Sequence, residues 1–122
     1  MDIVVRTYTG KGAIELFDTL EKRAADVEHV MRSVKGFISY TLARSSDGGF
    51  SVTVCKDKAG IDEANQKAKE WVAINAAEAG AASPKLTLGT TTIHIRSSAP
   101  EYASFQELQA APSRHLTSSL IA

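Results

Sequence analysis

The apolar residues between positions 13 and 34 recur with the spacing of an amphipathic helix. On a helical wheel they fall within one arc of roughly 140°, and charged residues occupy the opposite side. Gly10 and Gly12 let the chain turn into this helix, and Gly36 suits a left-handed cap at its end. The pattern therefore predicts one helix over residues 13–34. Its apolar arc consists of Ala13, Leu16, Phe17, Leu20, Ala24, Val27, Val30, Met31 and Val34.

A second helical pattern extends over about residues 58–78. Asp57 is positioned as its N-cap, and Gly80 is positioned to end it. Alanines dominate the inner arc, so we expect this helix to approach its neighbour closely. Trp71 lies on the same arc, and Asn75 follows one turn later and points into the middle of that arc.

Four segments have the composition of β-strands, rich in β-branched and aromatic residues. Asp47-Gly48 lies between two of them and predicts a hairpin turn in which the glycine supplies a positive φ. Gly89 lies within the last segment and suggests a bulge. The four predicted strands are residues 3–9, 37–44, 50–55 and 86–96.

These elements follow one another as strand, helix, strand, strand, helix, strand. A chain with this order closes most simply as a four-stranded antiparallel sheet with both helices on one face. We therefore predict an α+β fold of the ferredoxin-like βαββαβ type. This domain is expected to cover residues 1–96.

Residues 97–122 form a C-terminal tail in this scheme. Ser98 and Glu101 are spaced as a capping box with a proline in the first turn, which predicts a short helix over about residues 99–110. The end of the tail has two open alternatives: it docks on a partner subunit, or it stays disordered.

Positive and negative side chains cancel over the whole chain. The 122 residues include 14 Lys and Arg and 14 Asp and Glu, so the formal net charge is zero. This balance disfavours a nucleic-acid binder that relies on neutralising phosphates. In the predicted strands the only charged residues are Arg6, Arg44 and Arg96. Because two helices cover only one face of a sheet, a charge-poor second face predicts contact with a second sheet, most simply in a homodimer.

The sequence has no apolar segment that approaches the roughly 20 residues needed to span a bilayer. The N-terminal ten residues lack the basic and apolar regions of a secretory signal. Cys55 is the only cysteine, so it cannot form an internal disulfide. We therefore expect a cytoplasmic protein that does not interact with membranes.

Several residues are candidates for ligand binding or catalysis, and each has a structural alternative. Trp71 belongs either to the core or to a pocket wall, and the amide of Asn75 is satisfied either by a helix end or by a ligand. His94 alternates with two isoleucines on the last predicted strand, so it faces either a dimer interface or a pocket. The candidates for contacting an aromatic or anionic ligand are Tyr8, Tyr40, Arg6 and Arg44.

The alternatives for those four residues are also structural. The arginines could pair with a partner subunit or extend to solvent at the sheet edge, and the tyrosines could place their hydroxyls at the rim of the sheet. Cys55 is expected to be a small buried thiol. We expect no metal site, because the three histidines lie far apart in the sequence without paired Cys or His spacing.

The predicted hairpin and second helix resemble a known family. Their sequence is GFISYTLARSSDGGFSVTVCKDKAGIDEANQKAKEWV. This pattern is similar to the antibiotic biosynthesis monooxygenase-like proteins, and the similarity extends over residues 3–96. The resemblance implies a dimeric α/β barrel, in which two ferredoxin-like units pack sheet to sheet and each holds a pocket between its sheet and its helices. Some members of that family oxidise aromatic polyketides without flavin or metal, and others degrade haem.

The resemblance also bears on the candidate residues. Trp71 lies on the second helix as in the haem-degrading members, but Ala81 stands where their histidine is expected. The first strand offers Arg6 and Tyr8 in place of an asparagine. The resemblance therefore implies a cofactor-independent monooxygenase, or a binder of a small aromatic or anionic molecule, with no cofactor.

In the enzymatic interpretation, Trp71 would pack against the substrate ring, and Asn75 or His94 would orient or deprotonate a phenolic oxygen. The alternative is a non-catalytic dimerisation or stress-associated module. An enclosed pocket lined by at least two of Trp71, Asn75, His94 and Tyr40 favours the first interpretation. A solid core favours the second.

Overall fold

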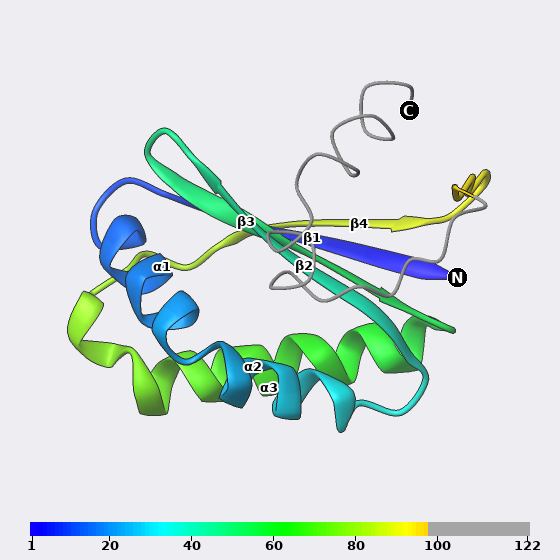
Figure 1. Ribbon diagram of the computed structural model, residues 1–122, viewed down its shortest axis with the longest axis horizontal. Helices are drawn as coiled ribbons and strands as arrows, with labels where there is room; N and C mark the ends of the chain where they lie inside the picture. Colours follow the sequence, from blue (N-terminus) through cyan, green and yellow to red (C-terminus); the bar gives the residue numbers. More distant parts are fainter. Residues whose placement is uncertain (98–122) are drawn as a thin grey trace. The chain divides into compact units, whose positions relative to one another are not determined.

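Strands and helices follow one another in the predicted order, except that the first helix is broken in two (Figure 1). The computed structural model describes residues 1–97. Residues 1–91 form one unit, and residues 92–97 belong to a second and contain no helix or strand. The elements are β1 (Asp2–Thr9), α1 (Ala13–Lys22), α2 (Ala24–Arg32), β2 (Phe37–Ser45), β3 (Gly48–Cys55), α3 (Lys58–Asn75), the short 3₁₀ helix η1 (Ala77–Ala79) and β4 (Lys85–Thr90).

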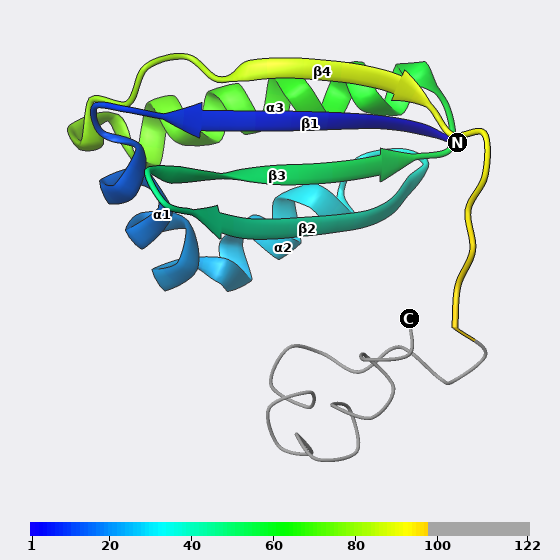
Figure 2. The same cartoon turned by 90° about the horizontal axis from the view of Figure 1, so that it is seen from above.

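The four strands form one antiparallel sheet in the order β2-β3-β1-β4. The helices α1, α2 and α3 of the described residues lie on one face of this sheet, as Figure 2 shows. This topology confirms the predicted ferredoxin-like α+β fold. The predicted tail helix over residues 99–110 lies outside the described residues. Within residues 1–97, no helix has the length and apolar character required to cross a bilayer.

The predicted continuous helix over residues 13–34 is wrong, because it breaks at Arg23. Arg23 ends α1 and begins α2, with a backbone conformation of φ −111° and ψ 35° that lies outside the helical region. Its side chain reaches α3, where it donates a hydrogen bond to Asn75. The break therefore coincides with a tertiary contact, and no glycine or proline marks it in the sequence.

The predicted last strand is too long. β4 ends at Thr90, and the isoleucines on both sides of His94 are largely exposed, Ile93 at 78% and Ile95 at 86%. His94 and Arg96 are therefore not strand residues. Gly89 pairs with Ile3 in regular register, so it makes no bulge. The irregularity lies instead in β2, between Phe37 and Ser39.

The predicted N-cap of the second helix is confirmed, but its predicted C-terminal end is not. α3 ends at Asn75 instead of about residue 78, and its C-cap is Ala76. The Asp57 carboxylate accepts a hydrogen bond of 3.1 Å from the backbone N–H of Gly60 and so caps α3. Gly36 has φ 79° in the connection to β2, but the C-cap of α2 is Ser33. Gly80 has φ 63° and caps η1 instead of α3. Both are left-handed conformations in which glycine is strongly favoured.

The two faces of the sheet differ in an unusual way. On β3, Ser51 and Thr53 face the helices and are buried, while the larger Phe50, Val52 and Val54 point to the open face. On β1, the buried helix-facing residues include Arg6. The charged residues of the four strands are Asp2, Arg6, Arg44 and Lys85.

The open face of the two central strands carries no charged residue. β1 contributes Ile3, Val5 and Thr7 to it, opposite the apolar residues of β3. All of these side chains are half-buried although no helix of residues 1–97 covers them. The charge-poor second face predicted from the sequence is therefore present in the central strands.

The hairpin between β2 and β3 differs from the predicted one. Its two turn residues are Ser46 and Asp47, and Gly48 already pairs with Ser45 as the first residue of β3. Gly48 has no positive φ. Glycine is needed there for space, because a Cβ at this position would lie 2.1 Å from the backbone oxygen of Tyr8 and 2.9 Å from the Cβ of Ala13.

A glycine substitution tests this close approach. We expect Gly48→Ala to lower the free energy of unfolding by at least about 3 kcal/mol, because β1 would have to move away from β3. Gly10→Ala is the control: Gly10 has φ +78°, and a Cβ added there would meet nothing within 4 Å. For this control we expect only the cost of left-handed strain, about 1–2 kcal/mol. Equal losses in urea unfolding of the two variants would contradict the steric explanation.

Candidate functional site

A small cavity lies between the helix-facing side of the sheet and the helices. Its volume is about 30 Å³, which is room for roughly two water molecules. Its polar residues are Arg6, Tyr8, Tyr40 and Ser51, all from the sheet, while the helices contribute an apolar wall. That wall, with one leucine from β2, consists of Leu20, Val27, Val30, Met31, Leu42, Ala68, Trp71 and Val72.

Arg6 brings a positive charge into the interior from the central strand β1. It is only 3% exposed. Its Nη1 donates a hydrogen bond of 2.6 Å to Oδ1 of Asn65 on α3, and its Nη2 donates one of 3.1 Å to Oγ1 of Thr53 on β3. Both acceptors are neutral, and no carboxylate among residues 1–97 forms an ion pair with Arg6. Buried charges are normally paired, so this arrangement is exceptional.

Burial governs the ionisation of the groups around this charge. It lowers the pKa of Arg6, and neighbouring Tyr40, Tyr8 and Cys55 oppose that change. Burial raises the pKa of Tyr8 and of Tyr40, while the positive charge of Arg6 lowers both. Both tyrosines are therefore neutral hydroxyls at neutral pH, able to donate a hydrogen bond.

The hydroxyl of Ser51 completes the polar part of the cavity. Ser51 is 2% exposed, and its oxygen has no partner of good hydrogen-bond geometry among the described residues. It lies near enough to Tyr40 to lower the pKa of that tyrosine slightly. An unsatisfied buried hydroxyl costs free energy, so this oxygen is available to a bound molecule or to water.

Trp71 closes the cavity from the side of α3 and is itself only half-buried. The guanidinium of Arg23 lies over its ring, 5.5 Å from the ring centroid, in a cation–π contact. Arg23 is held in turn by an ion pair with Asp26 and by a hydrogen bond to Asn75. The residue at the helix break therefore also positions the indole ring.

Asn75 lies outside the cavity. Its Nδ2 donates a hydrogen bond of 3.1 Å to the carbonyl oxygen of Trp71, and its Oδ1 accepts one of 2.8 Å from Arg23. The amide is thus satisfied at the end of α3, which is the structural alternative left open by the sequence. His94 is exposed beyond β4 and is not among the residues that line the cavity. Of the three predicted catalytic residues, only Trp71 lines it.

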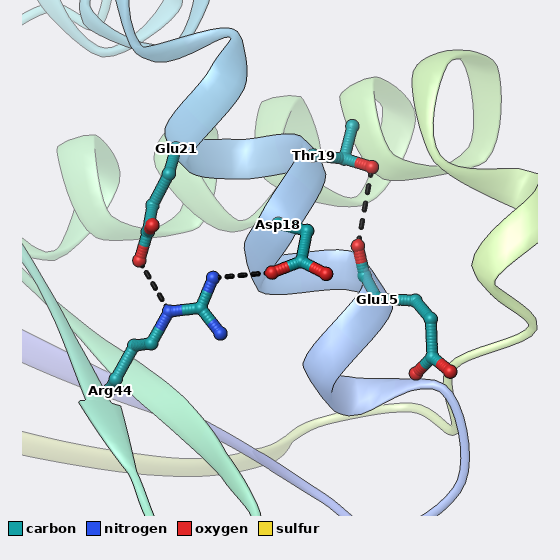
Figure 3. A network of polar contacts seen from close by, with 5 residues as sticks. All are labelled: Glu15, Asp18, Thr19, Glu21 and Arg44. Atoms are coloured by element: carbon teal, nitrogen blue, oxygen red, sulfur yellow. Dashed lines mark hydrogen bonds and ion pairs between the residues drawn. The ribbon is translucent and has the colours of Figure 1, made fainter.

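Arg44 serves a different purpose from the predicted ligand contact. From β2, its Nε donates to Oε2 of Glu21 at 2.5 Å, and its Nη2 donates to Oδ1 of Asp18 at 2.7 Å (Figure 3). These two carboxylates raise the pKa of Arg44. Arg44 therefore links the edge strand to α1 at the protein surface and does not line the cavity.

Three residues that hold or surround the buried charge were not predicted as site residues: Ser51, Thr53 and Asn65. The sequence carries a signal for them. On β3 the polar residues alternate strictly with apolar ones, so they share one face. Asn65 stands one helical turn after the buried Ile61, which places its amide on the inner side of α3. Within residues 1–97, no three His, Cys, Asp or Glu side chains are grouped as a metal site.

The tyrosines predict a dependence of stability on alkaline pH. A raised pKa in the folded state means that the unfolded chain loses the phenolic proton first. The free energy of unfolding should therefore be unaffected below the ordinary tyrosine pKa of about 10 and fall as pH rises above it. Burial also raises the pKa of the Cys55 thiol, which adds a decline that begins at lower pH.

Urea unfolding between pH 8 and pH 11 measures this effect. The double variant Tyr8→Phe/Tyr40→Phe should show a shallower decline above about pH 10 than the parent. Cys55→Ala removes only the thiol, so it should weaken the decline that begins at lower pH and keep the contribution of the tyrosines above about pH 10. Parallel curves for the parent and the double variant would show that the two hydroxyls are not protected by burial.

Comparison with known proteins identifies the fold. No family model matches the sequence, and no curated protein matches it. Solved structures do match. A variant of MhuD with two manganese protoporphyrin IX molecules bound per active site is 23% identical, with a TM-score of 0.56 over 79% of this chain and 98% of that one.

Two further matches are oxygenases. The monooxygenase ActVA-Orf6 of Streptomyces coelicolor, in complex with nanaomycin D, is 21% identical, with a TM-score of 0.57 over 80% of this chain and 92% of that one. SnoaB, a cofactor-independent oxygenase from Streptomyces nogalater, is 19% identical, with a TM-score of 0.53 over 79% and 97%. The resemblance seen in the sequence is thus confirmed at the level of structure, and this chain has the fold of the antibiotic biosynthesis monooxygenase-like proteins.

Proposed function

We propose that this chain forms a homodimer in which each cavity binds a small aromatic molecule and oxygenates it with O₂, without a metal or an organic cofactor. The observation that carries the proposal is the cavity, where the indole of Trp71 and an apolar wall face a buried set of hydrogen-bond donors. Trp71 and Tyr40 both line it. A cavity with this lining that widens on binding supports a ligand-binding protein over a purely structural module.

Binding of an aromatic ring requires the cavity to widen, because about 30 Å³ does not hold a ring. Two side chains are suited to move. Met31 has a flexible, unbranched side chain, and Trp71 is half-buried at the edge of the cavity. A ring that enters between them would stack against the indole and place its oxygen substituents toward Tyr8 and Tyr40.

The chemistry proposed here needs no redox group of the protein. A substrate with an acidic CH₂ beside its rings gives one proton to water in solution and becomes a carbanion, which the cavity then binds. The carbanion transfers one electron to O₂, and the resulting radical and superoxide combine to form a C–O bond. Protonation gives a hydroperoxide, and loss of water leaves a ketone, so that one oxygen atom enters the product and the other leaves in water. The protein's part is to hold the ring, exclude water and donate hydrogen bonds to oxygen atoms that gain charge.

The cavity does not fit a porphyrin. It is far smaller than that ring system, and none of the described residues that line it is a histidine or a cysteine. Ala81 also stands where the haem-degrading members are expected to have a histidine. We therefore derive no step that involves haem.

The open face of the sheet supports the proposed homodimer. Its central strands present Ile3, Val5, Phe50, Val52 and Val54 to the side on which none of the described helices lies. A contiguous apolar face without charge is rare on a monomer, and a second copy of the same face would cover it in a symmetric dimer.

Light scattering tests the dimer. We expect a mass of about 26 kDa, twice the 13.0 kDa of one chain, at micromolar concentration. Val52→Lys should shift the mass to that of one chain, because it would bury an unpaired charge in the interface. Ile74→Lys places the same charge at a residue of α3 that is 80% exposed, and it should leave the mass unchanged. A parent protein that scatters as a single chain would overturn the proposed assembly.

Oxygen consumption tests the activity. The protein should consume O₂ with at least one member of a panel of naphthols and hydroxylated anthrones. Trp71→Ala should lower kcat/KM for that substrate about tenfold or more, because it removes the ring contact. Ile74→Ala changes an exposed residue of the same helix and should have no effect. If no compound of the panel raises oxygen consumption above the uncatalysed rate, the oxygenase proposal is wrong.

A further inference from the structure

We propose that Arg6 makes the cavity selective for ligands that carry an ionised oxygen, so that an aromatic substrate is bound as its phenolate or enolate and not as the neutral molecule. This inference rests on the proposed function, because it concerns the same cavity. It goes further by naming the chemical class of the ligand and the residue that selects it.

The first argument is the missing counter-charge. Arg6 is 3% exposed, and its two hydrogen-bond acceptors, Thr53 and Asn65, are neutral. A guanidinium has five N–H donors, and these bonds engage two of them. The carboxylates that pair with arginines in the described residues, such as Asp18 and Glu21, lie at the surface. Arg6 lines the cavity, so an anion there would supply the counter-charge that the protein does not.

The second argument is that the polar groups of the cavity can all donate. Besides the Arg6 guanidinium, they are the hydroxyls of Tyr8, Tyr40 and Ser51. Ser51 has no partner of good geometry in the described residues, and neither tyrosine is ionised at neutral pH. The hydroxyls can also accept a hydrogen bond, but the guanidinium can only donate. A ligand that brings only donors would therefore leave Arg6 without a further acceptor, whereas an oxyanion accepts hydrogen bonds from the guanidinium and from the hydroxyls at once.

The third argument concerns the proton. Among residues 1–97, no histidine, aspartate or glutamate lines the cavity, and the groups that face Arg6 from β1, β2 and β3 are Tyr8, Tyr40 and Cys55. None of these is a strong base in its neutral form. The cavity is therefore suited to select a molecule that ionises in solution near neutral pH. It is less suited to remove a proton from a weakly acidic one.

A matched pair of probes tests this selectivity. 4-Nitrophenol ionises near neutral pH, and nitrobenzene has the same ring without the acidic oxygen. Trp71 is the only tryptophan of the chain, so its fluorescence reports binding at the cavity. We expect 4-nitrophenol at alkaline pH to bind at least about tenfold more tightly than nitrobenzene. Its affinity should rise with pH through the ionisation of the probe, and the bound probe should show the absorption of the phenolate at a pH where the free probe is largely protonated.

Variants of Arg6 separate recognition from folding. Arg6→Met should remove the preference for 4-nitrophenol, and Arg6→Lys should retain part of it because the charge remains. Arg44→Met, a change outside the cavity, should leave the preference intact. Removal of an unpaired buried charge should cost little stability in urea unfolding, whereas a purely structural arginine would cost much. If Arg6→Met does not fold, the selectivity for anions is still tested by the affinities of the parent and of Arg6→Lys for 4-nitrophenol and nitrobenzene.

The outcomes distinguish this inference from the proposed function. Equal affinities of the parent for nitrobenzene and 4-nitrophenol, or a preference that survives in Arg6→Met, would overturn the selectivity for anions and leave an aromatic binding site in place. Failure of every probe and every compound of the oxygen panel to bind would overturn the proposed function, and the inference with it. A preference for 4-nitrophenol that is lost in Arg6→Met and kept in Arg44→Met supports the selectivity for anions and the aromatic binding site on which it rests.

Discussion

The unpaired charge of Arg6 is the constraint on which the arrangement of the molecule depends. It lies in the interior on the central strand, so its neighbours on both sides must offer oxygen acceptors. β3 supplies Thr53, and α3 supplies Asn65. A strand that turns its polar side chains inward places its apolar ones outward, because successive side chains point to opposite faces. The alternation that turns Thr53 toward the buried guanidinium therefore also turns the apolar residues of β3 toward the open face of the sheet.

The positions of the helices are also linked to the cavity around Arg6. Alanines on the inner side of α3 bring the helix close to the sheet, which lets the short amide of Asn65 reach Arg6. Further along, Trp71 fills the space that the small residues leave, and Arg23 rests on its ring. The break between α1 and α2 occurs at that arginine, so the wall of the cavity and the course of the first helical segment are linked through one side chain.

The sequence predicted a feature correctly when the interaction that forms it joins residues close together in the chain. Asp57 acts within one turn of its helix, and its role as N-cap was identified. The break at Arg23 depends on contacts with Trp71 and Asn75, about fifty residues away, and no local signal marks it. The candidate site shows the same difference between local and long-range interactions. Arg6 and Tyr8 could be proposed as site residues because they lie on a predicted strand. That Thr53 and Asn65 surround Arg6 follows only from the strand register and the packing of α3.

The cost of a buried charge connects binding, assembly and stability. An ion removed from water without a counter-ion loses on the order of several kcal/mol, even after the protein relaxes. Hydrogen bonds to Thr53 and Asn65 offset part of that loss, but they bring no opposite charge. Burial of the apolar face against a second subunit would add stability at about 25 cal/mol per Å². An anion in the cavity would remove the remaining electrostatic penalty, so the site is least stable when empty, and that difference is available as binding free energy.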